Sequence, residues 1–187
     1  QQAEANRNRV LLVAAQRFRE RGLGGPGVAE LMREAGLTHG GFYKQFSSKD
    51  ELAAEACAAA IADNLVCYER LARRHRGNFA AIAAAMVSEH HRNSPGDGCV
   101  LASLGAEISR SDNSVRSKVT DGIRKIVDLL SGLMPGRSKK LARRKAIAAY
   151  TTVVGSLVVA RAVDDPALAR EILKAVREEL AARDSEG

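Results

Sequence analysis

The chain has 187 residues, 45% of them apolar and 27% charged, which is enough to bury a core and excludes a disordered chain. Lys and Arg number 29 against 22 Asp and Glu, and the net charge of +7 favours a polyanionic partner, with nucleic acid first. No apolar run approaches the ~18 residues that cross a bilayer, so we expect no membrane segment. Three irregularly spaced cysteines argue against a disulfide scaffold and indicate a cytoplasmic location.

The composition predicts an all-α fold, because no stretch alternates apolar and polar residues as a strand would. Helical spacing of apolar residues predicts about nine helices. Gly22 stands where a helix C-terminus favours a residue that tolerates positive φ. The first four helices are expected at 4–21, 28–35, 38–45 and 48–76.

Capping residues mark two of these starts. Thr38 is expected to be the N-cap of the third helix. Ser48 and Glu51 have the spacing of a capping box, which opens the long fourth helix. The sequence changes from short to long helices near Ser47, so we place a domain boundary there and expect domains 1–47 and 48–187.

The remaining helices are expected at 78–91, from Asp97 onward, from Asn113 onward, at 139–163 and at 166–182. The triplet Met134-Pro135-Gly136 should end the seventh helix. The last two helices are apolar over broad faces, which one small subunit cannot cover by itself. They predict a dimer interface.

Residues 27–46 have the pattern of a helix-turn-helix, with two short helices joined by a glycine-containing turn. Such a unit presents its second helix to the major groove of DNA and braces it with the first. Residues 36–52, GLTHGGFYKQFSSKDEL, closely resemble the signature of TetR-type (tetracycline-repressor-like) transcriptional regulators, and residues 14–22 resemble the first helix of that family.

The resemblance implies a dimeric repressor that a ligand releases from DNA. Its N-terminal domain would be a three-helix DNA-binding domain, followed by a helical ligand-binding and dimerisation domain. The fourth helix would link the two, and the helices at 139–163 and 166–182 would form the homodimer. The implied partners are double-stranded operator DNA with palindromic half-sites, a second copy and an unidentified small effector. The effector is expected to be apolar or aromatic.

Matching positions imply seven DNA-binding residues: Thr38, His39, Gly40, Gly41, Tyr43, Lys44 and Lys49. Thr38 and His39 would reach phosphate and a base edge, the two glycines would allow close approach, and Lys44 would reach a base or phosphate. Tyr43 and Lys49 would contact phosphates, the latter aided by a helix dipole. Simpler readings also stand: Thr38 only as a cap, Tyr43 as half-buried packing and Lys49 as a solvated charge.

Two departures from the family pattern make the operator non-transferable. The family often has Thr before the second helix, where this chain has Pro26-Gly27, and often has His at the position of Gln45.

Effector or sensor residues are expected on the apolar faces of the fourth, fifth and sixth helices: Cys57, Ile61, Leu65, Tyr68, Met86, His90, Cys99 and Leu104. If Asp97 caps the sixth helix, Cys99 lies in its first turn, where the helix dipole lowers a thiol pKa. That gives an alternative in which oxidants or electrophiles switch the protein through Cys99. The simpler reading of Cys99 is a small buried hydrophobe.

Other chemistry has little support in the sequence. Glu89, His90, His91 and Cys99 could suggest a metal site but lie on two elements, so we expect no metal and no cofactor. No nucleophile has a suitably spaced base and no phosphate loop is present, so we expect no catalytic residue and no enzyme. An enzyme that uses the helical pocket is the least favoured alternative. The basic run 137–145 could be a second nucleic-acid site, but a solvated helix end is the better interpretation.

Overall fold

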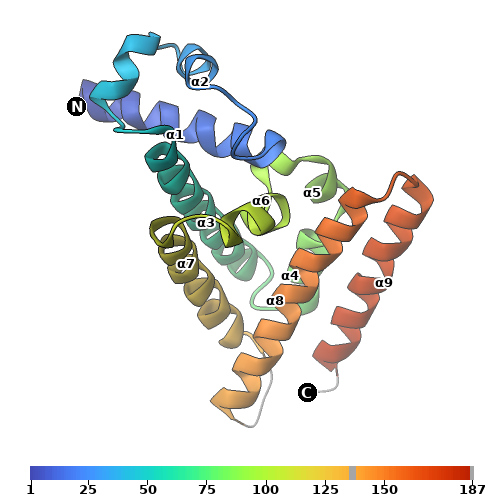
Figure 1. Cartoon of the computed structure of the whole chain (residues 1–187). Helices are drawn as coiled ribbons and strands as arrows, with labels where there is room; N and C mark the ends of the chain where they lie inside the picture. The colour runs from blue at the N-terminus through green and yellow to red at the C-terminus, as the bar shows by residue number, and fades with distance from the viewer. Residues whose placement is uncertain (135–137, 186–187) are drawn as a thin grey trace. The chain divides into compact units, whose positions relative to one another are not determined.

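The computed structural model describes residues 1–134 and 138–185, and this part of the chain is all-α (Figure 1). Nine α-helices and two 3₁₀ helices occur there without a strand, so the predicted fold class is confirmed. The elements are α1 (Gln2–Arg21), α2 (Val28–Glu34), η1 (His39–Lys44), α3 (Lys49–Arg74), α4 (Phe79–Met86), α5 (Glu89–Asn93), η2 (Pro95–Asp97), α6 (Val100–Ser109), α7 (Asn113–Ser131), α8 (Lys139–Ala162) and α9 (Pro166–Ser185).

Packing divides the chain into two compact units, with boundaries within α3, between α5 and η2, and within α7. Unit 1 is Gln1–Asp63 with Pro95–Asp121, and unit 2 is Asn64–Ser94 with Gly122–Gly187. The boundary expected after Ser47 concerns the separation of DNA binding from ligand binding, and it stays a prediction.

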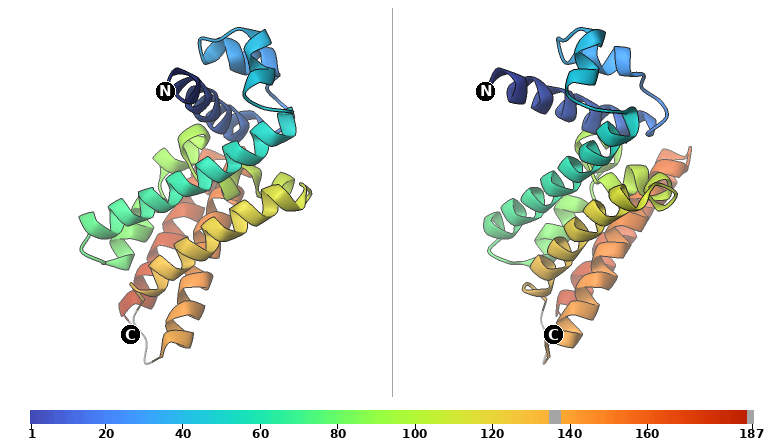
Figure 2. Two further views of the ribbon diagram at one scale, coloured as in Figure 1. Left: turned by 90° about the vertical axis from the view of Figure 1, so that its left-hand side faces the viewer. Right: turned by 60° about the vertical axis from the view of Figure 1, so that its left-hand side comes forward.

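Unit 1 is organised around α1, which contacts α2, η2 and α6. Figure 2 shows α2 and η1 together beside α1, and these two short helices also contact each other. Their apolar sides meet because each element buries one helical stripe. The core side chains are Val10, Ala14, Phe18, Leu31, Met32, Phe42, Phe46 and Leu52.

Unit 2 is built on α8 and α9, which lie side by side, with α4 against α9 and α5 against α8 (Figure 1). The rings of Tyr68 and Tyr150 meet edge to face with centroids 6.0 Å apart. By length and composition alone α8 could cross a membrane, a test that the core helix of a globular unit also passes. Its buried side, which includes Ala146, Val153 and Leu157, shows it in that core role.

Gly22 ends α1 as predicted, with φ 80° and ψ 164°, a conformation almost restricted to glycine. A Cβ atom there would lie 2.9 Å from Oε1 of Glu107. The same carboxylate accepts a hydrogen bond from the Leu23 amide at 2.8 Å. The turn after α1 is therefore joined closely to α6 within unit 1.

The start of α3 has the predicted Ser48 cap, since its hydroxyl accepts the Glu51 amide at 3.0 Å. The reciprocal half of the capping box differs from the prediction. The Glu51 carboxylate turns to Ser47 and accepts its amide at 2.6 Å and its hydroxyl at 2.5 Å. This bond to Ser47 lowers the pKa of Glu51.

Three predicted details are wrong. The third helix is the 3₁₀ helix η1, and its N-cap Thr38 makes no side-chain capping bond. Adjacent glycines have low α-helix propensity, which explains the tighter and shorter element. The fifth helix is broken into α4 and α5 because the Ser88 hydroxyl captures the amide of His91 at 3.2 Å and starts a new helix.

The third error concerns the start of α6. Residues 95–97 form η2, and α6 begins at Val100 with Cys99 as its N-cap. Cys99 therefore precedes the first turn of α6. The break expected at Met134-Pro135-Gly136 falls mainly on residues outside the described part of the chain, and α7 has already ended at Ser131.

Replacing Gly22 by alanine should lower the free energy of unfolding by about 1 to 3 kcal/mol, because alanine is strained at this φ and ψ. Gly24→Ala is the matched control, since a Cβ atom there meets nothing within 4 Å. Urea unfolding monitored by circular dichroism measures both. If the two variants are equally stable, alanine is not strained at position 22, which would contradict the backbone conformation of Gly22.

Candidate nucleic-acid interface

The second helix of the helix-turn-helix is η1, which buries one side chain and exposes most of the others. Phe42 is buried in the core of unit 1, whereas Tyr43 is 70% exposed and meets the Phe42 ring edge-on at 5.2 Å. Thr38, His39 and Lys44 are also exposed. The interpretation of Tyr43 as half-buried packing is therefore wrong. One side of η1 is held in the core by Phe42, and its other side is polar and exposed.

Thr38 and the two glycines form the start of this surface. The Thr38 backbone is extended and its hydroxyl caps no helix, so the cap interpretation does not hold for the side chain. A Cβ atom on Gly40 would meet nothing within 4 Å, which leaves its backbone open to a close partner. Gly41 lies closer to the interior, where a Cβ atom would be 3.6 Å from Cε of Met32.

Lys49 opens α3 and is half-buried beside the loop that joins α1 to α2. Its ammonium nitrogen is 3.4 Å from the carbonyl oxygen of Gly24, a long contact that an anion could replace. The structure thus groups six of the seven predicted residues on and just before η1 and places Lys49 at the next helix start. Their contacts with DNA stay predictions.

A clamp from α1 fixes the end of η1. The Arg7 guanidinium binds both carboxylate oxygens of Glu55 at 2.7 and 2.6 Å. It also lies over the Phe46 ring, 4.6 Å from the centroid. The hydrogen bond to Glu55 raises the pKa of Arg7. One side chain of α1 therefore holds both α3 and the segment that follows η1.

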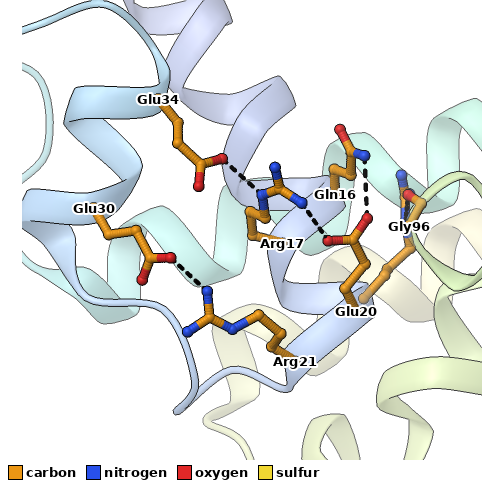
Figure 3. Close-up of polar contacts among 8 residues, drawn as sticks. Gln16, Arg17, Glu20, Arg21, Glu30, Glu34 and Gly96 are labelled. Carbon is orange, nitrogen blue, oxygen red and sulfur yellow. Dashed lines mark hydrogen bonds and ion pairs between the residues drawn. The ribbon is translucent and has the colours of Figure 1, made fainter.

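Two further arginines of α1 brace α2 (Figure 3). Arg17 contacts Glu34 and Glu20, each at 2.6 Å. Arg21 contacts Glu30 at 2.5 Å, and this contact lowers the pKa of Glu30. The carboxylates of α2 are thereby neutralised internally. Sequence reasoning missed the pairs with Glu30 and Glu34 and the clamp, because these partners belong to different helices and follow no helical spacing.

Arg19 joins α1 to η2 from inside unit 1. Its side chain is buried, and its Nε donates to the Gly96 carbonyl at 2.6 Å. Burial lowers the pKa of Arg19, and the charges of Asp63 and Asp97 oppose that shift.

The cysteine environment gives the redox alternative little support. Burial, together with the charge of Glu107, raises the pKa of Cys57 to about 11, so this thiol is protonated at neutral pH. Burial also raises the pKa of Cys67. Cys99 is the N-cap residue of α6, so it does stand at a helix N-terminus, but it is buried, which limits the access of an oxidant or electrophile.

The eight predicted effector or sensor residues divide between the two units. Cys57, Ile61, Cys99 and Leu104 are buried in unit 1, whereas Leu65, Tyr68, Met86 and His90 belong to unit 2. Of the latter, Tyr68 and Met86 are buried and Leu65 is half-buried. Their role as an effector site stays a prediction.

His90 needs a correction. It is exposed on α5, because the break before Ser88 turns the next residue inward instead. His91 is the half-buried histidine, with its Nδ1 at 2.7 Å from the Met86 carbonyl oxygen. In the described part of the chain, no three potential metal ligands come together.

Comparison with known proteins bears on the segment from α1 to α3. A family model described as "Bacterial regulatory proteins, tetR family" matches residues 10–56, which include every residue assigned above to the DNA interface. Residues 10–56 are therefore similar to the DNA-binding segment of TetR-family regulators. We refer below to residues 2–56, which comprise α1, α2, η1 and the first turns of α3, as the TetR head.

The HTH-type transcriptional repressor NemR of Escherichia coli (strain K12) is 26% identical over 129 residues. This match covers 67% of the chain and 65% of the repressor, so it spans just under two thirds of that relative. The crystal structure of reduced E. coli NemR has a TM-score of 0.75 at 22% identity and covers 94% of both chains.

Two other solved structures share the fold at lower identity. A TetR-family regulator from Cytophaga hutchinsonii has a TM-score of 0.79 at 16% identity, covering 97% of this chain and 96% of that one. FadR of Bacillus subtilis in complex with stearoyl-CoA has a TM-score of 0.56 at 17% identity, covering 90% and 96%.

Arg7→Met should destabilise the TetR head by about 1 kcal/mol, since it removes a partly exposed ion pair and the contact with Phe46. Arg9→Met is the matched control, because Arg9 is exposed on the same helix and donates a hydrogen bond to its neighbour Asn6. Chemical denaturation compares them. A control as unstable as Arg7→Met would contradict the clamp.

Acidification should destabilise unit 2 through His91. Burial lowers the pKa of His91 below the value of about 6.5 that an exposed histidine has, so the folded state favours the neutral ring. Its contribution to stability is complete above that pH and is lost as the pH falls through the lowered pKa. We expect His91→Asn to lose less stability than the wild type between pH 7 and 5. His90→Asn, at the exposed neighbour, should behave like the wild type.

Proposed function

We propose that this protein is a dimeric repressor that binds a palindromic operator through η1 and the start of α3, and leaves it when a small effector binds. One observation carries the proposal: η1 anchors itself through buried Phe42 while exposing Thr38, Tyr43 and Lys44. A protein that recognises DNA needs a helix that is held rigidly by core packing on one side and exposes polar side chains on the other. The match of residues 10–56 to the TetR family model supports it, as does the match to a protein named as a repressor.

The proposed homodimer is supported by apolar side chains that unit 2 leaves exposed. Ile147 and Val158 of α8 and Leu168 of α9 are each between 41% and 45% exposed. A second copy with the same face would cover them, and twofold symmetry would place two TetR heads on matching half-sites.

The effector is proposed to be small and apolar or aromatic, because the predicted lining consists mainly of aliphatic, thiol and aromatic side chains. The structure of FadR with stearoyl-CoA supports an apolar ligand in a protein of this fold. Switching through Cys99 is the second proposal and has less support, since Cys99 is buried and an oxidant or electrophile would have to reach it.

Fluorescence anisotropy with DNA from upstream of the protein's own gene tests the assignment of the interface. Lys49→Gln should weaken binding to operator and random duplexes alike and reduce the salt slope by about one, since one phosphate contact is lost. Tyr43→Phe should act in the same direction through its hydroxyl. His39→Ala should instead change the preference among sequences.

Lys174→Gln is the control, since Lys174 is an exposed lysine of α9 whose described ion pair is with Glu178. An unchanged salt slope for Lys49→Gln would refute the phosphate contact. Upstream DNA bound no more tightly than random DNA would argue against an operator there. A mild thiol oxidant is added in a separate arm, and we expect it to leave the complex intact.

A further inference from the structure

The excess positive charge of the chain is not in the unit that contains the TetR head. Unit 1 holds 11 Lys and Arg against 12 Asp and Glu, whereas unit 2 holds 18 against 10. The formal net charges are therefore −1 and +8. The positive charge that favours a nucleic-acid partner is therefore carried by unit 2.

Much of this charge gathers at one end of unit 2. The end of α3 and the turn after it carry Arg70, Arg73, Arg74 and Arg76, all exposed. A Cβ atom on Gly77 in this turn would lie 3.5 Å from Leu133, so the turn contacts the end of α7. Figures 1 and 2 show the end of α7 between the end of α3 and the start of α8.

The start of α8 adds cations to the same end. Arg143 forms an ion pair with Asp128 of α7, and Lys139 and Arg143 line a small pocket of about 380 Å³ with Asp128 and Ser131. We call this set the α3–α8 basic surface: Arg70, Arg73, Arg74, Arg76 and Lys139. Lys140, Arg143 and Arg144 are left out, because they line a pocket together with Ile147, which belongs to the proposed dimer contact.

Local structure explains only part of this charge. The arginines at the end of α3 favour the helix, because cations stabilise the negative end of its dipole. Lys139 has the opposite effect at the start of α8, whose first turn contains no acidic residue. No ion pair involving Arg73, Arg74, Arg76 or Lys139 occurs in the described part of the chain. An external anion would remove this electrostatic cost.

We propose that the α3–α8 basic surface binds the backbone phosphates of duplex DNA, in addition to the operator contact of the TetR head. The proposal rests on the proposed function, because it takes DNA as the partner. Guanidinium groups match phosphate geometry and are the usual choice for nucleic-acid backbones. No large apolar side chain is exposed between residues 67 and 78, whereas membrane or protein partners require apolar anchors. A hydrated polyanion fits this composition best.

The test uses the full chain and a duplex of random sequence, titrated by anisotropy between 50 and 200 mM salt. The variant Arg73→Gln/Arg74→Gln/Arg76→Gln should bind this duplex about tenfold more weakly, with a salt slope lower by about two to three. The matched control is Arg116→Gln/Arg170→Gln/Lys174→Gln, which lowers the net charge equally at three exposed positions. It should retain the wild-type slope. Circular dichroism checks that both variants fold.

A bridging assay separates this proposal from the operator proposal. Immobilised upstream DNA should hold the wild type, which then captures a second, labelled random duplex. The triple arginine variant should still bind the immobilised DNA but lose the capture. If the variant still captures the second duplex, the proposed role of the α3–α8 basic surface is wrong. If the wild type binds the upstream DNA no better than random DNA, the operator proposal is wrong instead. The proposal would also be overturned if the triple arginine variant lost binding to anionic vesicles or to an acidic peptide while its binding to DNA stayed unchanged.

Discussion

The shape of η1 is the constraint on which the TetR head depends. A 3₁₀ helix of six residues with adjacent glycines does not hold its shape alone in water, because few backbone bonds offset the conformational entropy. Packing on the buried side of η1 keeps this helix ordered. Phe42 and Phe46 are buried together with ring centroids 5.6 Å apart, and Arg7 covers the second ring while gripping Glu55 of α3. The exposed residues of η1 can then meet a partner without first being ordered.

Ion pairs give the same head its electrostatic character. Arg17 and Arg21 bind the carboxylates of α2, so the acidic residues of the first helix of the helix-turn-helix are paired inside the head. Lys44 is exposed and Lys49 half-buried at the proposed DNA surface. Unit 1 is close to neutral overall, and its affinity for DNA would therefore come from the placement of a few cations. The large positive excess of unit 2 is a separate feature with its own proposed use.

The sequence could predict whatever depends on neighbours along the chain. Helical spacing located most helices, Gly22 was recognised as a helix end, and the motif at 36–52 identified the family. Competition between neighbouring groups was harder to foresee. Ser88 breaks the fifth predicted helix by capping a new one. As a result His91, and not His90, lies on the inward side. The η2 turn delays the start of α6, so that Cys99 becomes its N-cap. The Arg7 clamp and the braces of α2 join residues with no periodic relation, so only the folded chain reveals them. The seven DNA residues are grouped as the motif implied, but their contacts require DNA.

Hydroxyl-radical footprinting of the complex with upstream DNA tests the central claim, that two braced TetR heads read one operator, most directly. The account predicts two protected backbone patches on the same face of the duplex. They would be related by twofold symmetry and separated by about one or more helical turns. Removing the Tyr43 hydroxyl and the Lys49 charge together should weaken the protection of both patches equally. A single unsymmetrical patch, or protection that does not respond to these two residues, would contradict the account.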